Sequence, residues 1–73
     1  MNERDRMKER IEWERHDIEW NKRFIQDMEK HKKKAIAKGW VKSLPLIDEI
    51  IKTAESDILK AKNNIKKLIK EAR

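Results

Sequence analysis

Two tryptophans, Trp13 and Trp20, lie seven residues apart among arginines and have the clearest capacity for recognition chemistry. Arg10 and Arg15 flank the first of them, and Phe24 follows four residues after the second. Aromatic side chains interleaved with Arg can stack on nucleotide bases. Trp and Arg also dominate the energetic centres of protein–protein interfaces. We interpret the face formed by Trp13, Trp20 and Phe24 as one covered by a second copy of the chain or by another protein.

Lysine-rich segments are the second candidate for recognition. The residues that could contact phosphate are Lys32, Lys33, Lys34, Lys60, Lys66, Lys67 and Lys70. Lys contacts to phosphate release counterions and make binding sensitive to salt. The chain has no helix-turn-helix pair, zinc finger or RNA-binding sheet motif, and outward lysines of helical proteins usually form a solvated surface. A nucleic-acid partner is therefore the alternative to a protein partner.

The chain offers little for catalysis or metal binding. Ser43 and Ser56 have no neighbouring His, and the single Gly and the lack of Cys exclude a glycine-rich phosphate loop and a thiolate centre. Glu12 and His16 lie one helical turn apart, but His31 is too distant along the helix to complete a metal shell. We expect no catalytic residue, no metal, no cofactor and no small-molecule substrate.

Composition limits how these residues can be positioned. The chain has 73 residues, of which 47% are charged and 5% aromatic, with one Gly, one Pro and no Tyr or Cys. The chain has few of the residues that form turns and strands, so a single all-α module is expected. No run of 18 apolar residues exists, and the Cys-free composition fits a reducing, cytoplasmic location. A membrane partner is not expected, although residues 58–73 form a basic amphipathic segment.

Heptad spacing predicts a first helix over about residues 3–38. Ile11, Ile18 and Ile25 recur every seven residues, with no Gly or Pro before Gly39. The Trp positions and Phe24 widen the apolar arc beyond what one partner helix covers. Asn21 lies at a core position of the heptad and is expected to fix register.

A turn at 39–43 and a second helix over about 44–72 follow. Apolar residues then alternate steps of three and four without a break, the pattern of a coiled-coil seam. These residues are Leu44, Ile47, Ile51, Ala54, Ile58, Ala61, Ile65, Leu68 and Ala72. Pro45 fits the first helical turn, where its missing N–H costs nothing.

The short turn predicts an antiparallel helical hairpin, and the charge pattern favours the same pairing. Residues 30–42 carry six lysines and no acid, whereas residues 43–57 are acidic, so folding back places opposite charges together. We expect Ile25 to lie near Ile58 and Ile18 near Ile65. One seam buries too little area for 73 residues, so two hairpins are expected to form a homodimeric four-helix bundle. The predicted self-association core is Ile11, Ile18, Ile25, Met28, Ile47, Ile51, Ile58, Ile65 and Leu68.

These patterns predict a non-enzymatic regulatory or adaptor protein that self-associates and binds a protein through an exposed helical face. In layout the hairpin resembles the four-helix-bundle RNA-binding regulators of plasmid copy number. No sequence motif is shared with that group, so the resemblance assigns no role to any residue.

Overall fold

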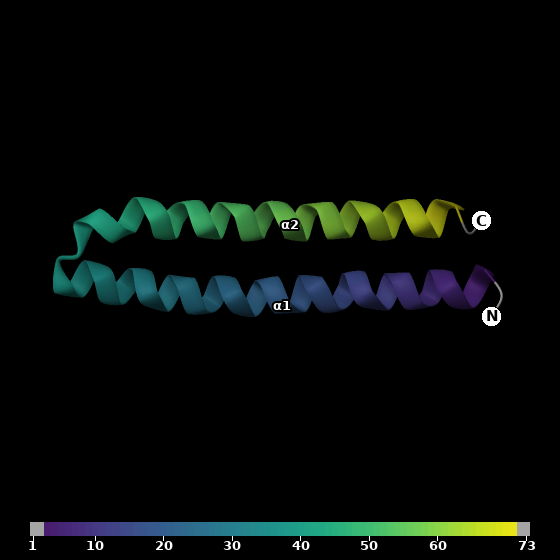
Figure 1. Cartoon of the computed structure of the whole chain (residues 1–73), viewed down its shortest axis with the longest axis horizontal. Coiled ribbons are helices and arrows are strands. Elements are labelled where there is room, and N and C mark those ends of the chain that lie inside the picture. The colour runs from purple at the N-terminus through teal and green to yellow at the C-terminus, as the bar shows by residue number, and fades with distance from the viewer. Residues whose placement is uncertain (1–2, 72–73) are drawn as a thin grey trace.

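A computed structural model of the chain, which describes residues 3–71, shows two long helices folded into a hairpin (Figure 1). Helix α1 spans Glu3–Lys38, a 3-10 turn (η1) spans Val41–Ser43, and helix α2 spans Leu44–Glu71. The predicted all-α hairpin is confirmed, and the predicted helix bounds agree with the structure. The last predicted residue of the second helix, Ala72, lies outside the described residues.

Both ends of α1 follow from its sequence. Glu3 and Asp5 lie in the first turn, where carboxylates suit the positive end of the helix dipole. At the other end the Gly39 N–H donates to Ile36 O at 3.2 Å and the Trp40 N–H donates to Ala35 O at 2.8 Å. Gly39 has a φ of +74°. This is the Schellman arrangement, in which a left-handed residue closes the helix and turns the chain back.

The helices pack along one strip of heptad positions. In α1 the side chains that are buried or half-buried are Met7, Ile11, Glu14, Ile18, Asn21, Ile25, Met28, Lys32 and Ala35. In α2 the strip comprises the predicted residues Leu44, Ile47, Ile51, Ala54, Ile58, Ala61, Ile65 and Leu68. All nine residues of the predicted core therefore lie in the contact between the two helices of one chain. Within residues 3–71 only Ile18, Ala35, Ala54, Ala61 and Leu68 are buried, and the other seam residues are half-buried.

Two polar contacts fix the register of the hairpin. Asn64 Nδ2 donates to Glu14 Oε1 at 3.5 Å, and Lys32 Nζ lies 2.7 Å from Asp48 Oδ1. Interpolation between these contacts places Ile18 level with Ala61. Ile65, which was expected near Ile18, lies about one helical turn further along α2 from this level.

In the same register Ile25 lies level with Ala54, and Ile58, which was expected near it, lies about one turn further along α2. The prediction paired the isoleucines of the two helices with each other. At these two levels the structure sets an isoleucine of α1 against an alanine of α2, and unlike sizes interdigitate well at a close helix contact.

Asn21 is paired within its own helix. Its Nδ2 donates to Asp17 O in the preceding turn of α1, at 3.0 Å. The residue nevertheless occupies a seam position and is half-buried there. The hydrogen bond of Asn21 stays within α1 and therefore does not select a register. A larger hydrophobic residue at position 21 would act on register only through its apolar contact with α2.

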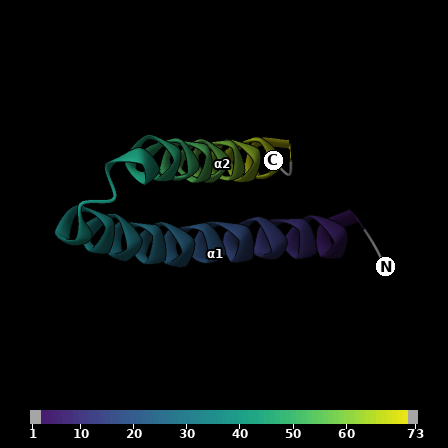
Figure 2. The ribbon, with the colours of Figure 1, turned by 60° about the vertical axis from the view of Figure 1, so that its left-hand side comes forward.

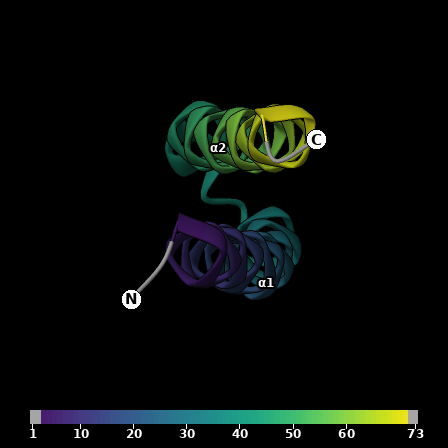
Figure 3. The same ribbon diagram turned by 90° about the vertical axis from the view of Figure 1, so that its right-hand side faces the viewer.

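The hairpin is a rod in which each helix has one neighbour (Figures 2 and 3). Its extents are 55 × 15 × 12 Å, and its radius of gyration is 16.7 Å. A compact chain of this length has a radius of gyration of about 11 Å. In Figure 1 the start of α1 and the end of α2 lie at one end of the rod, and the turn lies at the other.

Gly39→Ala should lower the free energy of unfolding by about 1 kcal/mol, because a Cβ is strained at positive φ. No atom lies within 4 Å of the Cβ position, so the cost comes from the backbone alone. Urea denaturation followed by circular dichroism measures it. Gly39→Asn is the control and should be destabilised less, since Asn tolerates this conformation. Equal stability of all three chains would contradict the cap.

Candidate interaction surfaces

The tryptophans predicted to form an interface stay outside the helix seam. Trp13 is 62% exposed and Trp20 is 71% exposed, although both belong to the large apolar residues. They occupy the same heptad position two turns apart on α1, and Phe24 follows one turn after Trp20. Phe24 is also exposed, at the margin of the seam. The structure thus brings the three predicted residues onto one side of α1.

A groove between the helices extends this apolar surface onto α2. Phe24 lines it together with Leu46 and Ile50 of α2, and Ala54 lies at its base. Its polar lining consists of Asn21, Glu49, Thr53 and Asp57. We name the surface formed by Trp13, Trp20, Phe24, Leu46 and Ile50 the Trp face. Sequence analysis found its α1 part but not Leu46, which looked like an ordinary residue of a helix start.

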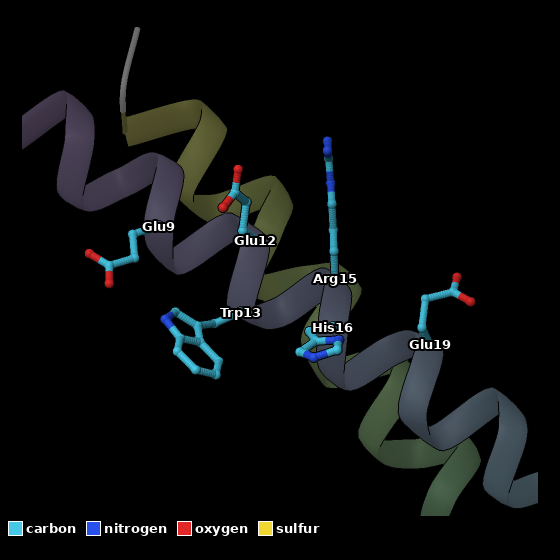
Figure 4. A pocket seen from close by; sticks show the side chains of 6 residues that line it. All are labelled: Glu9, Glu12, Trp13, Arg15, His16 and Glu19. Atoms are coloured by element: carbon cyan, nitrogen blue, oxygen red, sulfur yellow. The ribbon is translucent and has the colours of Figure 1, made fainter.

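A second hollow lies on the outer side of α1 and is formed by that helix alone (Figure 4). Its lining residues are Glu9, Glu12, Trp13, Arg15, His16 and Glu19. Figure 4 shows the Trp13 ring projecting to one side of the helix, whereas Glu12, Arg15 and Glu19 project to another. No group of three or more acidic, His or Cys side chains within residues 3–71 is placed to hold a metal ion. The hollow is thus lined by one aromatic ring and by charged groups, with no arrangement for a metal ion among them.

The predicted phosphate-binding lysines fall into three environments. Lys32 is half-buried and pairs with Asp48, so its charge is already engaged by a carboxylate. Lys33 and Lys34 are exposed near the turn end of the rod. Lys60, Lys66, Lys67 and Lys70 are exposed along α2 towards the opposite end. We leave Lys32 out of the candidate phosphate surface for this reason.

Sequence analysis missed a cluster of exposed apolar residues around the turn. Ile36 lies in the last turn of α1, and Trp40 and Val41 lie in the connection to α2. All three are exposed, and Lys38 Nζ stands 4.9 Å from the centre of the Trp40 ring. Apolar residues at a helix end commonly pack onto the helix, and the structure shows that half or more of each of these residues remains exposed. The closeness of Ile36, Trp40 and Val41 in sequence was the available clue.

Neither a family nor a relative is found by comparison. No protein-family model matches this chain, and no curated protein or solved structure shows significant similarity to it. In the part of the chain that the structure describes, neither helix is long and apolar enough to cross a membrane. Function must therefore be argued from the surfaces themselves.

The Lys32–Asp48 pair should show a coupling free energy of about 0.5 kcal/mol in a double-mutant cycle of Lys32→Gln and Asp48→Asn. Both side chains are partly exposed, so solvent screens the attraction, and the coupling should fall at high salt. Unfolding in urea measures each of the four free energies. The Lys22–Glu19 pair, at 3.8 Å within α1, is the control and should couple more weakly. Coupling that is equal in both pairs would contradict a role in register.

Proposed function

We propose that this chain is a non-enzymatic interaction module whose hairpins self-associate through the Trp face and whose assembly binds another protein. The observation that carries the proposal is the exposure of Trp13 and Trp20 beside a seam that is complete without them. Large aromatic side chains contribute most to interface energy when water is removed from them. Solvent-exposed Trp side chains do not stabilise the isolated hairpin.

The solvent-exposed area of the chain supports the proposal that one of its sides is an interface. The chain exposes 6521 Å² for a mass of 8.9 kDa, whereas a compact monomer of that mass exposes about 4,800 Å². The excess of about 1,700 Å² is roughly twice the 800 Å² that one partner buries in a standard interface. If a partner covers one long side of the rod, the exposed area of the chain falls to that of a compact monomer of the same mass.

A second copy of the hairpin is the occupant that fits this side best. The Trp face runs along the rod and includes residues from both helices, so a second rod can cover it over much of its length. Two hairpins packed in this way form a four-helix bundle, in which every helix has two neighbours. The shared side is the same on both copies, as two-fold symmetry requires.

The protein partner is assigned to the outer side of α1. The hollow there is lined by Trp13, Arg15 and His16 and by three carboxylates, those of Glu9, Glu12 and Glu19. Arg and Trp together are typical of interface centres, and mixed charges give orientation to a protein partner. This surface belongs to one helix. Trp13 at its edge is shared with the Trp face, whereas Arg15, His16 and Glu19 stay available when a second hairpin covers the groove.

Trp20→Asp should weaken self-association by roughly thirtyfold while leaving the helix content unchanged, because Trp20 lies outside the seam. Sedimentation equilibrium measures the association, and circular dichroism measures the helix content. Leu59→Asp is the matched control: Leu59 is similarly exposed but lies outside the Trp face, and its variant should associate as the parent chain does. A parent chain that is monomeric at micromolar concentration would contradict self-association.

Nucleic-acid binding is the second candidate, supported by the charge of α2. Its last turns carry Lys60, Lys66, Lys67 and Lys70 with Lys62, and Glu71 is the only acid between residues 58 and 71. None of these lysines belongs to an ion pair found among residues 3–71. A run of cations along a straight helix can follow a phosphate backbone by shape without reading bases.

If nucleic acid is the partner, neutralising Lys66, Lys67 and Lys70 to Gln should lower the salt dependence of binding. The slope of log affinity against log salt should fall by about three, at roughly one for each phosphate that is no longer neutralised by a lysine. Fluorescence anisotropy with duplex RNA and with duplex DNA measures the slope. Neutralising Lys22, Lys30 and Lys52, which lie nearer the turn than this run does, is the charge-matched control. Unchanged affinity of the triple variant at every salt concentration would exclude this surface.

A further inference from the structure

The hairpin turn carries exposed apolar residues at the extreme end of the rod. Val41 is 69% exposed, Ile36 is 60% exposed and Trp40 is 51% exposed. Neither the helix seam nor the Trp face uses them. The turn joins the two helices at the end opposite to the helix termini, so it projects along the long axis (Figure 1).

Lysines surround these apolar residues, and acids are absent from the same stretch of sequence. Residues 30–43 contain six Lys and no Asp or Glu. Lys33, Lys34, Lys38 and Lys42 are all exposed. The nearest acid on α2, Asp48, is already paired with Lys32. The tip therefore presents apolar side chains within a net positive field.

This combination is the chemistry of an interfacial membrane contact. Trp prefers the boundary between headgroups and acyl chains, and Lys can lay its aliphatic stem along apolar groups while its ammonium stays among headgroups. Each Lys near an anionic leaflet adds attraction. The Lys38 ammonium over the Trp40 ring shows that cation and aromatic group already share one location here.

Nucleic acid fits the tip less well than a lipid surface does. Val41 and Ile36 are aliphatic and offer no ring on which a base could stack. No Arg lies between residues 24 and 72, so the tip lacks the fork that recognises phosphate in two contacts. A projecting end can also press into a flat fluid layer, whereas a nucleic-acid duplex is usually met by a long side.

We propose that the hairpin turn docks onto an anionic phospholipid bilayer, with Trp40, Val41 and Ile36 inserted at headgroup depth and the surrounding lysines bound to acidic headgroups. The helices stay outside the bilayer and carry the Trp face into the aqueous phase. This docking is independent of the proposed self-association. It differs from the sequence-based expectation of no membrane partner, which weighed the apolar stripe of the second helix and not the turn.

Co-sedimentation of the full chain with vesicles tests the proposal. Vesicles of phosphatidylcholine alone are compared with vesicles in which about one lipid in four is phosphatidylserine. We expect binding to the second kind only. Lys33→Gln, Lys34→Gln and Lys42→Gln combined should weaken it by roughly a hundredfold, at about fivefold for each lysine. Lys38 is left in place because it stacks on Trp40.

Two further variants separate docking from general charge attraction. The combination Lys60→Gln, Lys62→Gln and Lys66→Gln removes the same charge far from the turn and should leave most of the binding. Val41→Ser removes apolar contact without changing charge and should weaken binding, whereas Leu59→Ser should not. Circular dichroism checks that each variant keeps its helices.

Three results would overturn the proposal. The first is equal binding to both kinds of vesicle, and the second is equal weakening by the two lysine triples. The third is binding of a single-stranded RNA that depends on Lys33, Lys34 and Lys42 while vesicles stay unbound. A monomeric chain that still binds phosphatidylserine vesicles through Val41 would support the docking and contradict only the self-association.

Discussion

An α-helix turns once every 3.6 residues, so a helix with one neighbour can bury only side chains that recur every three or four positions. In this chain that strip is the whole of the core, and it holds two helices of 36 and 28 residues together. Every other side chain of residues 3–71 faces the surroundings to some degree. The fold therefore fixes a narrow seam and leaves long sides on which binding surfaces can be built.

The two helices differ in the polarity of the side chains that they place in this seam. The strip of α2 is apolar apart from the half-buried Asp48, whereas that of α1 contains Glu14, Asn21 and Lys32. Each of these polar groups finds a partner: Asn64, the Asp17 carbonyl and Asp48, respectively. Polar residues in a seam lower its stability, and Glu14 and Lys32 also penalise wrong alignments, because a shifted α2 would leave them unpaired. Asn21 keeps its partner within α1 in any alignment. The aromatic residues of α1 lie outside the seam and face outwards.

Periodicity and caps were sufficient to predict the helices, their bounds and the antiparallel hairpin, because each depends on residues close in sequence. Register was not predictable in the same way. Isoleucines recur along both helices, so an alignment shifted by one turn looked equally apolar, and the alternation of Ile18 with Ala61 becomes visible only in space. The ion pair of Lys32 and the exposure of Val41 likewise depend on contacts between distant parts of the chain. Self-association and partner choice depend on a second molecule.

The closure at Gly39 also decides which chain supplies each helix. All contacts between α1 and α2 would be the same if α2 folded against the α1 of a second molecule, since the seam does not distinguish one chain from another. Domain exchange of this kind is governed by the connecting turn. The left-handed residue and the hydrogen bonds of the turn direct α2 back to its own α1. The choice between a closed hairpin and an exchanged pair of chains therefore depends on this turn and on protein concentration.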